Sequence, residues 1–256
     1  MTILRVWQIS KRFGGVSALD DVSIDIEQGS ITALVGPNGA GKTTLFDLIG
    51  GFAQPDSGEI LFKSQHIGGL PPERIAERGI GRTFQSVRLF LQMPVLENVM
   101  LASQNSRGET LAAALFRSRR MVEQEDACRQ HALDLLETVG LRSSACKPAG
   151  HLSQGQKKLL EITRCLALGA ELMLLDEPLA GLAPAMVKEM KQVMRQLRGA
   201  GKTIVFIEHN IQAVMELSDI VVVLSHGTKL AQGPPEVVQQ NRDVIQTFLG
   251  RSSGAS

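Results

Sequence analysis

The sequence predicts an α/β fold: a mixed or parallel sheet, an N-terminal antiparallel β subdomain and an inserted α-helical subdomain. The opening residues up to Ile26 alternate apolar and polar side chains with a period of two, which is typical of half-exposed antiparallel strands. Later apolar runs are nearly continuous, at residues 31–35, 172–175, 203–207 and 220–224, as in strands buried on both faces. Helical patterns lie between these later runs, and strands that alternate with helices favour a parallel sheet.

Two strands at the N-terminus are predicted from apolar residues at every second position. These residues are Leu4, Val6, Ile9, Val22, Ile24 and Ile26. Gly14 and Gly15 supply the turn that separates the two strands. Further strands are expected at residues 58–62 and 80–84, the first of them after a turn at residues 55–58.

The middle of the chain changes to helical character, from about Val95 to Val139. Leu133, Leu135 and Leu136 form an apolar stripe on an otherwise charged segment. Residues 105–120 are rich in Arg, Ser and Ala, and we expect a mobile connection there. The helical run therefore reads as an insertion into the α/β fold.

The length of 256 residues favours one domain that carries a subdomain. We expect a core built from residues 1–92 and 154–250, which includes the antiparallel β subdomain. Residues 93–153 are the expected helical subdomain. The tail at residues 251–256 is small and polar, and we expect it to be disordered.

Composition excludes some classes of function. The formal net charge is +1, so nothing indicates a nucleic-acid binder. The three cysteines are odd in number and lack metal-type spacing, which predicts free thiols and a cytoplasmic location. The N-terminus lacks the apolar run of a signal peptide, and the longest apolar stretches are too short to span a bilayer, so we expect any membrane role to come through a partner.

A P-loop pattern occupies residues 36–44, between a buried strand and a helix-forming run that begins at Lys42. Backbone N–H groups of such a loop converge on a phosphate because the helix start leaves them unpaired. Lys42 would neutralise the β- and γ-phosphates, and the hydroxyl of Thr43 would ligate Mg²⁺. A glycine-rich turn that only caps a helix is the alternative. The residues expected to bind ATP are Asn38, Gly39, Ala40, Gly41, Lys42, Thr43 and Thr44.

Two adjacent carboxylates, Asp176 and Glu177, end the apolar run at residues 172–175. Isolated buried carboxylates are costly, so a pair beside a phosphate loop is well explained by Mg²⁺ and a reacting water. We expect Asp176 to hold the metal and Glu177 to orient or deprotonate the water. A strand that simply exits into solvent is the alternative.

A second helix start follows the sequence Leu-Ser-Gln-Gly-Gln at residues 152–156. Apolar residues recur with a helical period from Lys157 to Leu168, and Ser153 suits the N-cap position. Capping alone explains this helix start without a ligand. The other interpretation is a second anion site.

In order and spacing, the P-loop, the Leu-Ser-Gln-Gly-Gln segment and the Leu-Leu-Asp-Glu-Pro segment resemble the ATPase domain of ABC transporters. The resemblance covers nearly the whole chain. Gln85 resembles the Q-loop of the family, and His209 resembles its switch histidine. Phe13 stands where the family usually places an aromatic residue that stacks on adenine, with Trp7 as the competing aromatic.

The resemblance implies hydrolysis of ATP with Mg²⁺. The implied catalytic residues are Lys42, Gln85, Glu177 and His209. Gln85, Asp176 and His209 would also contact the nucleotide, and the implied metal ligands are Thr43, Gln85 and Asp176. In this family two ATPase subunits, identical or paired, pack head to tail, so Ser153, Gly155 and Gln156 would serve the ATP of the partner subunit.

The resemblance also implies partners in a membrane. Transmembrane permease subunits would bind the chain, and Leu89, Phe90 and Met93 are candidates for that contact. A periplasmic or extracellular solute-binding protein would act indirectly, and the chain would lie on the inner face of the cell membrane.

Two positions depart from the family pattern. Gln154 replaces the first glycine of the signature pair, and we expect phosphate contact to survive because Gly155 remains. Ala183 replaces an Asp or Asn that communicates between the two nucleotide sites, so the resemblance does not imply their coordination.

Four segments, at residues 82–90, 96–99, 159–165 and 243–245, resemble the branched-chain amino acid uptake subfamily. The implied function is to energise uptake of a small solute of that kind. Import of urea, amides or other amino acids is the alternative, since those ATPase subunits are closely similar. An ABC ATPase that works on nucleic acid or ribosomes would normally bring a long coiled coil or a duplicated cassette, and a regulatory module would not need Glu177 and His209.

Overall fold

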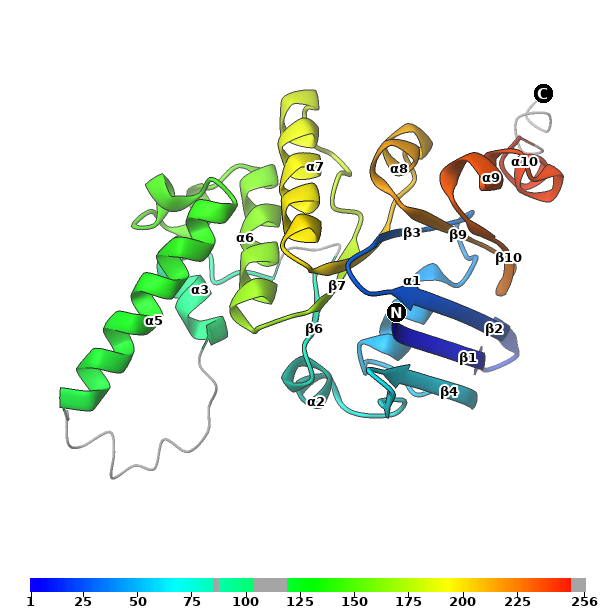
Figure 1. The fold of residues 1–256 in the computed structure, drawn as a ribbon, viewed down its shortest axis with the longest axis horizontal. Helices are drawn as coiled ribbons and strands as arrows, with labels where there is room; N and C mark the ends of the chain where they lie inside the picture. Colours follow the sequence, from blue (N-terminus) through cyan, green and yellow to red (C-terminus); the bar gives the residue numbers. More distant parts are fainter. Residues whose placement is uncertain (85–87, 104–118, 250–256) are drawn as a thin grey trace. The chain divides into compact units, whose positions relative to one another are not determined.

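The computed structural model describes residues 1–84, 88–103 and 119–249. The chain divides into two compact units. The first unit contains residues 1–85, 171–181 and 194–256, and the second contains residues 86–170 and 182–193. Figure 1 labels the elements along the chain.

The first unit is built on a sheet that, within the described residues, has six strands in the order β10-β9-β3-β8-β7-β6. Its members are β3 (Ile31–Val35), β6 (Ile80–Arg82), β7 (Leu172–Asp176), β8 (Thr203–Ile207), β9 (Ile220–Ser225) and β10 (Thr228–Gly233). The first five run parallel, and β10 pairs with β9 in the antiparallel sense. Every residue of β3 and β8 is buried, as continuous apolar runs predict.

A second sheet of the first unit is antiparallel, and its described strands follow the order β2-β1-β4-β5. Their bounds are β1 (Thr2–Phe13), β2 (Val16–Glu27), β4 (Ser57–Phe62) and β5 (Gln65–His66). Along β2 the later residues alternate between buried and more exposed, so one face carries the apolar residues Val22, Ile24 and Ile26. The period-two pattern of the sequence is therefore confirmed.

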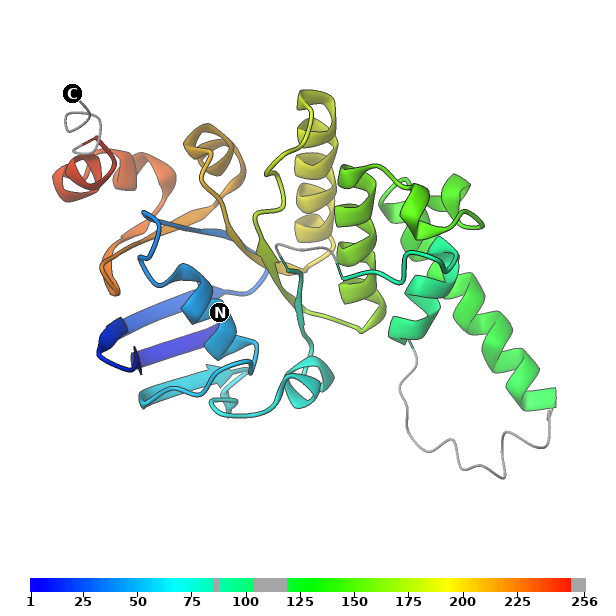
Figure 2. The ribbon, with the colours of Figure 1, turned by 180° about the vertical axis from the view of Figure 1, so that it is seen from behind.

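Helix α1 (Lys42–Ile49) lies between the two sheets (Figures 1 and 2). Its apolar residues Leu45, Phe46, Leu48 and Ile49 belong to one buried cluster with side chains from both sheets. The helix that begins at the P-loop is thus packed on two sides, which fixes the loop in front of it. The remaining helices of this unit are α2 (Pro72–Glu77), α8 (Ile211–Leu217), α9 (Pro235–Gln239), α10 (Arg242–Leu249) and the end of α7 (Pro184–Gly199).

The second unit is helical. Helix α3 (Val95–Ser103) packs against α5 (Arg119–Thr138) and α6 (Gln154–Ala167), and two short 3-10 turns at Arg142–Ser144 and Ala149–His151 connect α5 to α6. Leu136 is fully buried, while Leu133 and Leu135 of the predicted stripe are half-buried. The start of α7 also belongs to this unit.

The α/β class, the antiparallel sheet and the helical insertion agree with the sequence expectation. The strand expected at residues 80–84 ends at Arg82. Of the connection expected at 105–120, residues 105–118 lie outside the described residues and the last two are helical, while the tail at 251–256 also lies outside them. The expected domain boundaries stay a prediction.

The three cysteines carry free thiols, as expected. Cys165 is completely buried, and burial raises the pKa of its thiol to about 12. In the part of the chain that the structure describes, no helix combines the length and the apolar character needed to cross a membrane.

Candidate functional site

The P-loop joins the carboxyl end of β3 to the first turn of α1. Gly41 is the N-cap of α1, with φ of 99°, and no side chain caps this helix start. A Cβ at Gly41 would lie 2.6 Å from the carbonyl oxygen of Ala18, so only glycine fits. The N–H groups of the first turn are therefore turned toward the loop, where an anion can accept their hydrogen bonds.

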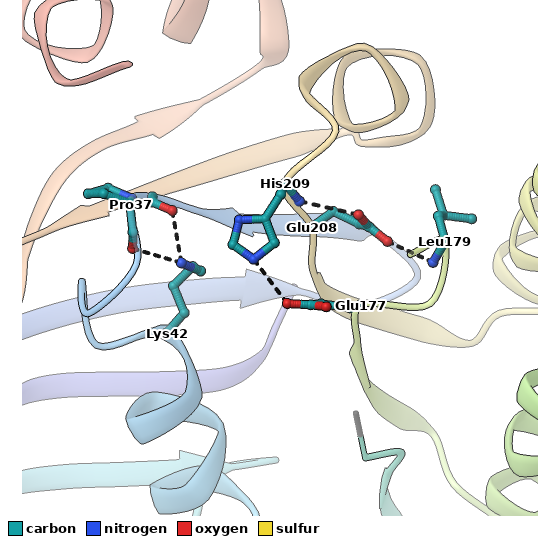
Figure 3. Close-up of polar contacts among 7 residues, drawn as sticks. Pro37, Lys42, Glu177, Leu179, Glu208 and His209 are labelled. Atoms are coloured by element: carbon teal, nitrogen blue, oxygen red, sulfur yellow. Dashed lines mark hydrogen bonds and ion pairs between the residues drawn. The ribbon is translucent and has the colours of Figure 1, made fainter. Parts of the chain in front are cut away.

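Lys42 is 6% exposed and points back into the loop (Figure 3). Its Nζ donates to the carbonyl oxygens of Gly36 at 2.8 Å and Pro37 at 2.9 Å. Burial lowers the pKa of Lys42, and the nearby carboxylates of Glu177 and Asp176 oppose that effect. The lysine charge and the acidic pair therefore share one electrostatic neighbourhood.

The other P-loop residues surround this lysine. Asn38, Gly39 and Thr43 are exposed, Thr44 is half-buried and Ala40 is buried. The side chain of Thr43 is thus accessible at the first turn of α1, whereas the small side chain of Ala40 belongs to the core.

The acidic pair lies at the carboxyl end of β7. Asp176 is the last strand residue, and its N–H donates to the hydroxyl of Thr83 at 3.2 Å. Burial raises the pKa of Asp176, the Arg82 guanidinium opposes this, and the Glu177 carboxylate adds to it. Burial destabilises the charged form of the Asp176 carboxylate, and a nearby cation would stabilise it.

Glu177 adopts a left-handed backbone conformation, with φ of 48°. Such a conformation is uncommon for a residue with a side chain, and residues of this kind cluster at functional sites. Its N–H donates to the carbonyl of Ile207 on the neighbouring strand at 3.1 Å. The strand therefore turns sharply at the residue that the sequence analysis singled out.

His209 meets Glu177 at the same edge of the sheet. The two residues follow β8 and β7, which are parallel neighbours, so their carboxyl ends lie together. The His209 Nε2 is 3.0 Å from the Glu177 Oε1 (Figure 3). The His209 side chain is 47% exposed and that of Glu177 is 21% exposed, so the pair is accessible to a ligand.

Glu208 was not singled out by the sequence analysis. Its carboxylate is buried between the loop that follows Glu177 and the main chain of His209, and it accepts the N–H groups of Leu179 and His209. The pattern that could have identified Glu208 is an acid directly after an apolar run, and the same pattern identified Asp176. In the sequence analysis the adjacent His209 received the functional role, and Glu208 received none.

Arg82 also had no assigned role. Its guanidinium donates to Asp47 at 2.7 Å and lies over the rings of Phe46, Phe52 and Phe84, at 5.2–5.8 Å from their centroids. Its positive charge opposes the rise in the pKa of Asp176. No sequence pattern predicts such a cluster, because its members come from α1, β6 and the loops beside them.

The second helix start belongs to the second unit and is a capping box. Ser153 Oγ accepts the Gln156 N–H at 3.3 Å, and the Gln156 side chain accepts the Ser153 N–H at 3.0 Å. A Cβ at Gly155 would lie 2.2 Å from Cγ of Met186, so glycine is needed for packing as well. The expected N-cap role of Ser153 is confirmed, and the expected contact with a nucleotide stays a prediction.

Two further candidates remain open. Phe13 is 53% exposed at the end of β1, with the Lys11 Nζ 5.4 Å from its ring centroid, and Trp7 is 54% exposed. Exposure therefore does not separate the two aromatic residues. Gln85 lies outside the described residues.

The donors present suit magnesium better than a softer metal. Thr43 and Asp176 offer a hydroxyl and a carboxylate, which are hard oxygen ligands, and Mg²⁺ takes its other ligands from water and phosphate. Among the described residues there is no group of three or more His, Cys, Asp or Glu side chains that could hold a metal by itself. The site fits a metal that arrives with a phosphate ligand.

Comparison with known proteins gives consistent results. The family model described as ABC transporter matches residues 19–180. The chain is 39% identical over 251 residues to the high-affinity branched-chain amino acid transport ATP-binding protein LivG of Escherichia coli (strain K12), and the match covers 98% of each chain.

Solved structures agree. The ADP conformation of an ATP-binding cassette of an ABC transporter has 34% identity and a TM-score of 0.83, covering 98% of this chain and 99% of that one. A dimeric cassette in a post-hydrolysis state, bound to ADP and phosphate, has 25% identity and a TM-score of 0.75, covering 91% and 98%. By sequence and by fold, the chain belongs to the ABC transporter family, as one of its nucleotide-binding ATPases.

Proposed function

We propose that this protein is the ATP-hydrolysing subunit of an importer and energises the uptake of branched-chain amino acids. The proposal draws its substrate class from the relatives, which are named as branched-chain amino acid transport ATP-binding proteins and match almost end to end. Family membership supports the coupling of ATP hydrolysis to transport.

One observation carries the catalytic part of the proposal. Lys42, Asp176, Glu177 and His209 lie at or after the carboxyl ends of β3, β7 and β8, which are parallel neighbours in one sheet, so their side chains share its carboxyl edge. Ligands of open α/β sheets bind at that edge. A buried cation and two acids, one of them held by a histidine, are the groups that phosphoryl transfer to water requires.

The P-loop is proposed to hold the triphosphate. The uncapped N–H groups at the start of α1 would bind phosphate oxygens, with Asn38, Gly39, Ala40, Gly41 and Thr44 shaping the loop. Lys42 would exchange its two carbonyl partners for the β- and γ-phosphates. Phe13 is proposed to stack on the adenine.

Thr43 and Asp176 are proposed as magnesium ligands, together with Gln85. Bound Mg²⁺ would neutralise negative charge on the phosphates during transfer. The raised pKa of Asp176 fits this role, because a carboxylate deprived of water gains most from a nearby cation.

Glu177 is proposed to orient and deprotonate the attacking water. Its carboxylate already contacts the His209 ring, so His209 would fix its direction and then reach the γ-phosphate. The left-handed backbone at Glu177 aims the side chain away from the strand axis and toward the histidine. Gln85 completes the proposed catalytic set.

A second ATPase subunit is proposed to complete the site. Ser153, Gly155 and Gln156 would contact the nucleotide of that partner through the helix start that they form. The solved dimer of a related cassette supports the presence of a second subunit. Transmembrane permease subunits and, indirectly, a solute-binding protein complete the proposed assembly, with this chain on the inner face of the cell membrane.

The test has two stages. Purified protein should release phosphate from ATP in the presence of Mg²⁺, and chelation of Mg²⁺ should stop the release. Cells that lack the gene should lose uptake of labelled leucine and regain it with the wild-type gene but not with a Glu177→Gln gene expressed equally. Loss of labelled urea uptake, with leucine uptake unchanged, would contradict the proposed substrate class.

A further inference from the structure

Glu208 is a buried acid whose two carboxylate oxygens are both bound by main-chain groups. It directly follows β8 and is 3% exposed. Its Oε1 accepts the N–H of Leu179 at 2.6 Å, and its Oε2 accepts the N–H of His209 at 3.2 Å (Figure 3). Since a buried carboxylate costs free energy unless hydrogen bonds replace its water, both contacts matter to this side chain.

The bond to Leu179 connects the two loops that carry the proposed catalytic pair, and the bond to His209 holds the carboxylate within its own loop. Leu179 comes two residues after Glu177, and His209 is the next residue after Glu208. The side chains of Glu177 and His209 meet at 3.0 Å on the accessible side of the same loops. The Glu208–Leu179 hydrogen bond thus joins the two loops beneath the contact between the Glu177 and His209 side chains.

We propose that Glu208 is a positioning residue for ATP hydrolysis. Its carboxylate sets the spacing between the Glu177 loop and the His209 loop, and so holds the imidazole against the Glu177 carboxylate. It acts through these two residues. The inference rests on the proposed function of the site, and it assigns to the reaction a buried residue whose two carboxylate oxygens accept main-chain N–H groups.

The chemistry of the amide makes Glu208→Gln the sharpest variant. Glutamine keeps the size of the side chain, but one of its terminal groups is an NH₂, which cannot accept a second N–H. The variant therefore loses either the bond to Leu179, which joins the two loops, or the bond that holds the main chain of His209. Because a shift of about 1 Å in a catalytic group can cost on the order of 100-fold in rate, we expect kcat to fall about 10- to 100-fold. We expect KM for ATP to change less than about twofold, because the P-loop is untouched.

The matched control is Glu59→Gln. Glu59 is exposed on β4, in the antiparallel sheet. The control variant therefore makes the same change of charge at a residue that belongs to neither of the two loops. We expect its kcat to equal that of the wild type. A wild-type kcat in Glu208→Gln, or a rise in KM with kcat unchanged, would overturn the proposal.

A second variant covers the case in which Glu208→Gln fails to fold, as judged by its melting temperature and ATP binding. Glu208→Asp keeps the charge and both acceptor oxygens but is one methylene shorter, so it cannot reach both N–H groups. The same loss of kcat is expected. Unchanged kcat in a folded Glu208→Asp protein would also overturn the proposal.

A double-mutant cycle tests whether Glu208 acts through the histidine. With labelled ATP, so that slow turnover stays measurable, Glu208→Gln should slow a His209→Ala protein far less than it slows the wild type. Equal slowing in both backgrounds would contradict the proposal. If the wild type itself releases no phosphate from MgATP, the proposed function fails; if the wild type is active and Glu208 has no effect on kcat, only this inference fails.

Discussion

At the scale of single residues, the buried Lys42 has the clearest expected effect. Replacing it with alanine removes the positive charge and the two hydrogen bonds that its Nζ makes to the loop. We expect Lys42→Ala to weaken MgATP binding at least about tenfold, since a hydrogen bond to a charged group contributes about 1.5–3 kcal/mol. Titration with a fluorescent ATP analogue measures the affinity.

Lys229→Ala is the control for this measurement, because Lys229 is exposed on β10. Its affinity for MgATP should match that of the wild type. Unchanged affinity in Lys42→Ala would remove the phosphate site from the proposal.

The sequence predicted the proposed catalytic residues better than it predicted their supports. Lys42 and His209 follow buried strands and Asp176 ends one, and the ends of parallel neighbouring strands share an edge, so their proximity follows from the topology. Glu208 could not be assigned in this way. Its role depends on which main-chain N–H groups of another loop turn toward it, and no pattern in the sequence specifies that.

At the scale of elements, the start of the helical unit is held by polar side chains of α3 and α6. Glu161 and Arg164 of α6 bind the two main-chain groups of Arg88: the carboxylate accepts its N–H at 2.8 Å, and the guanidinium donates to its carbonyl. Asn98 of α3 accepts the N–H of Phe90 and donates to its carbonyl, each at 3.0 Å. Residues 88–90 are thereby attached to α6, the helix that begins after Ser153.

Glu161 predicts a dependence of stability on pH. Burial raises the pKa of Glu161 above its usual 4.5, although the hydrogen bond from Arg88 opposes the rise. The folded protein therefore binds this proton more tightly than the unfolded protein, and the resulting stabilisation is complete at acid pH and lost as pH rises through the raised value. We expect the unfolding free energy of the wild type to fall relative to that of Glu161→Gln between pH 4.5 and neutral pH. Urea unfolding of both proteins across this range measures it, and parallel pH curves would refute the assignment.

Asn98 predicts a large loss of stability. It is completely buried, and its amide group also donates to the carbonyls of Met93 and Pro94. Asn98→Ala removes the acceptor of the Phe90 N–H and one donor from each of the three carbonyls, which keep a main-chain donor, so we expect the unfolding free energy to fall by about 2–4 kcal/mol. Chemical denaturation measures the loss. Asn210→Ala, which removes a single capping hydrogen bond from α8, should cost about 1 kcal/mol; an equal loss in both variants would contradict this account.

The elements that sequence patterns predicted least well are polar or short. β10 contains Thr, Lys, Gln and Gly, is at least partly exposed throughout and, among the described strands, pairs with β9 alone, so no apolar period marks it. β6 has one strongly apolar residue, Ile80, and owes its place to its pairing with β7. Such strands form because a neighbouring strand offers hydrogen bonds, which a single segment of sequence does not reveal.

At the scale of the whole molecule, the proposal requires two subunits. Glu177→Gln keeps the shape of the side chain but cannot accept the proton of the water, so we expect the rate of ATP hydrolysis to fall at least about 100-fold. ATP would still bind, and it would hold two subunits together through Lys42 of one and Ser153 of the other. Light scattering should show a dimer with MgATP and a monomer without it.

The control is the same variant with Lys42→Ala added, which should stay monomeric with MgATP because it binds nucleotide poorly. Rapid hydrolysis by Glu177→Gln would show that another group activates the water.

The position of β3 has a consequence for the making of the protein on the ribosome. This strand lies between β8 and β9, which are synthesised roughly 170 residues after it, and it carries the P-loop at its end. At a synthesis rate of about 5–20 residues per second, roughly 10–35 s pass between the synthesis of β3 and that of its first neighbour, β8. During that time a strand of four apolar residues and one threonine, with two unpaired edges, is open to chaperones or to aggregation. A nascent chain therefore completes the strand neighbours of its P-loop only after β8 and β9 have emerged.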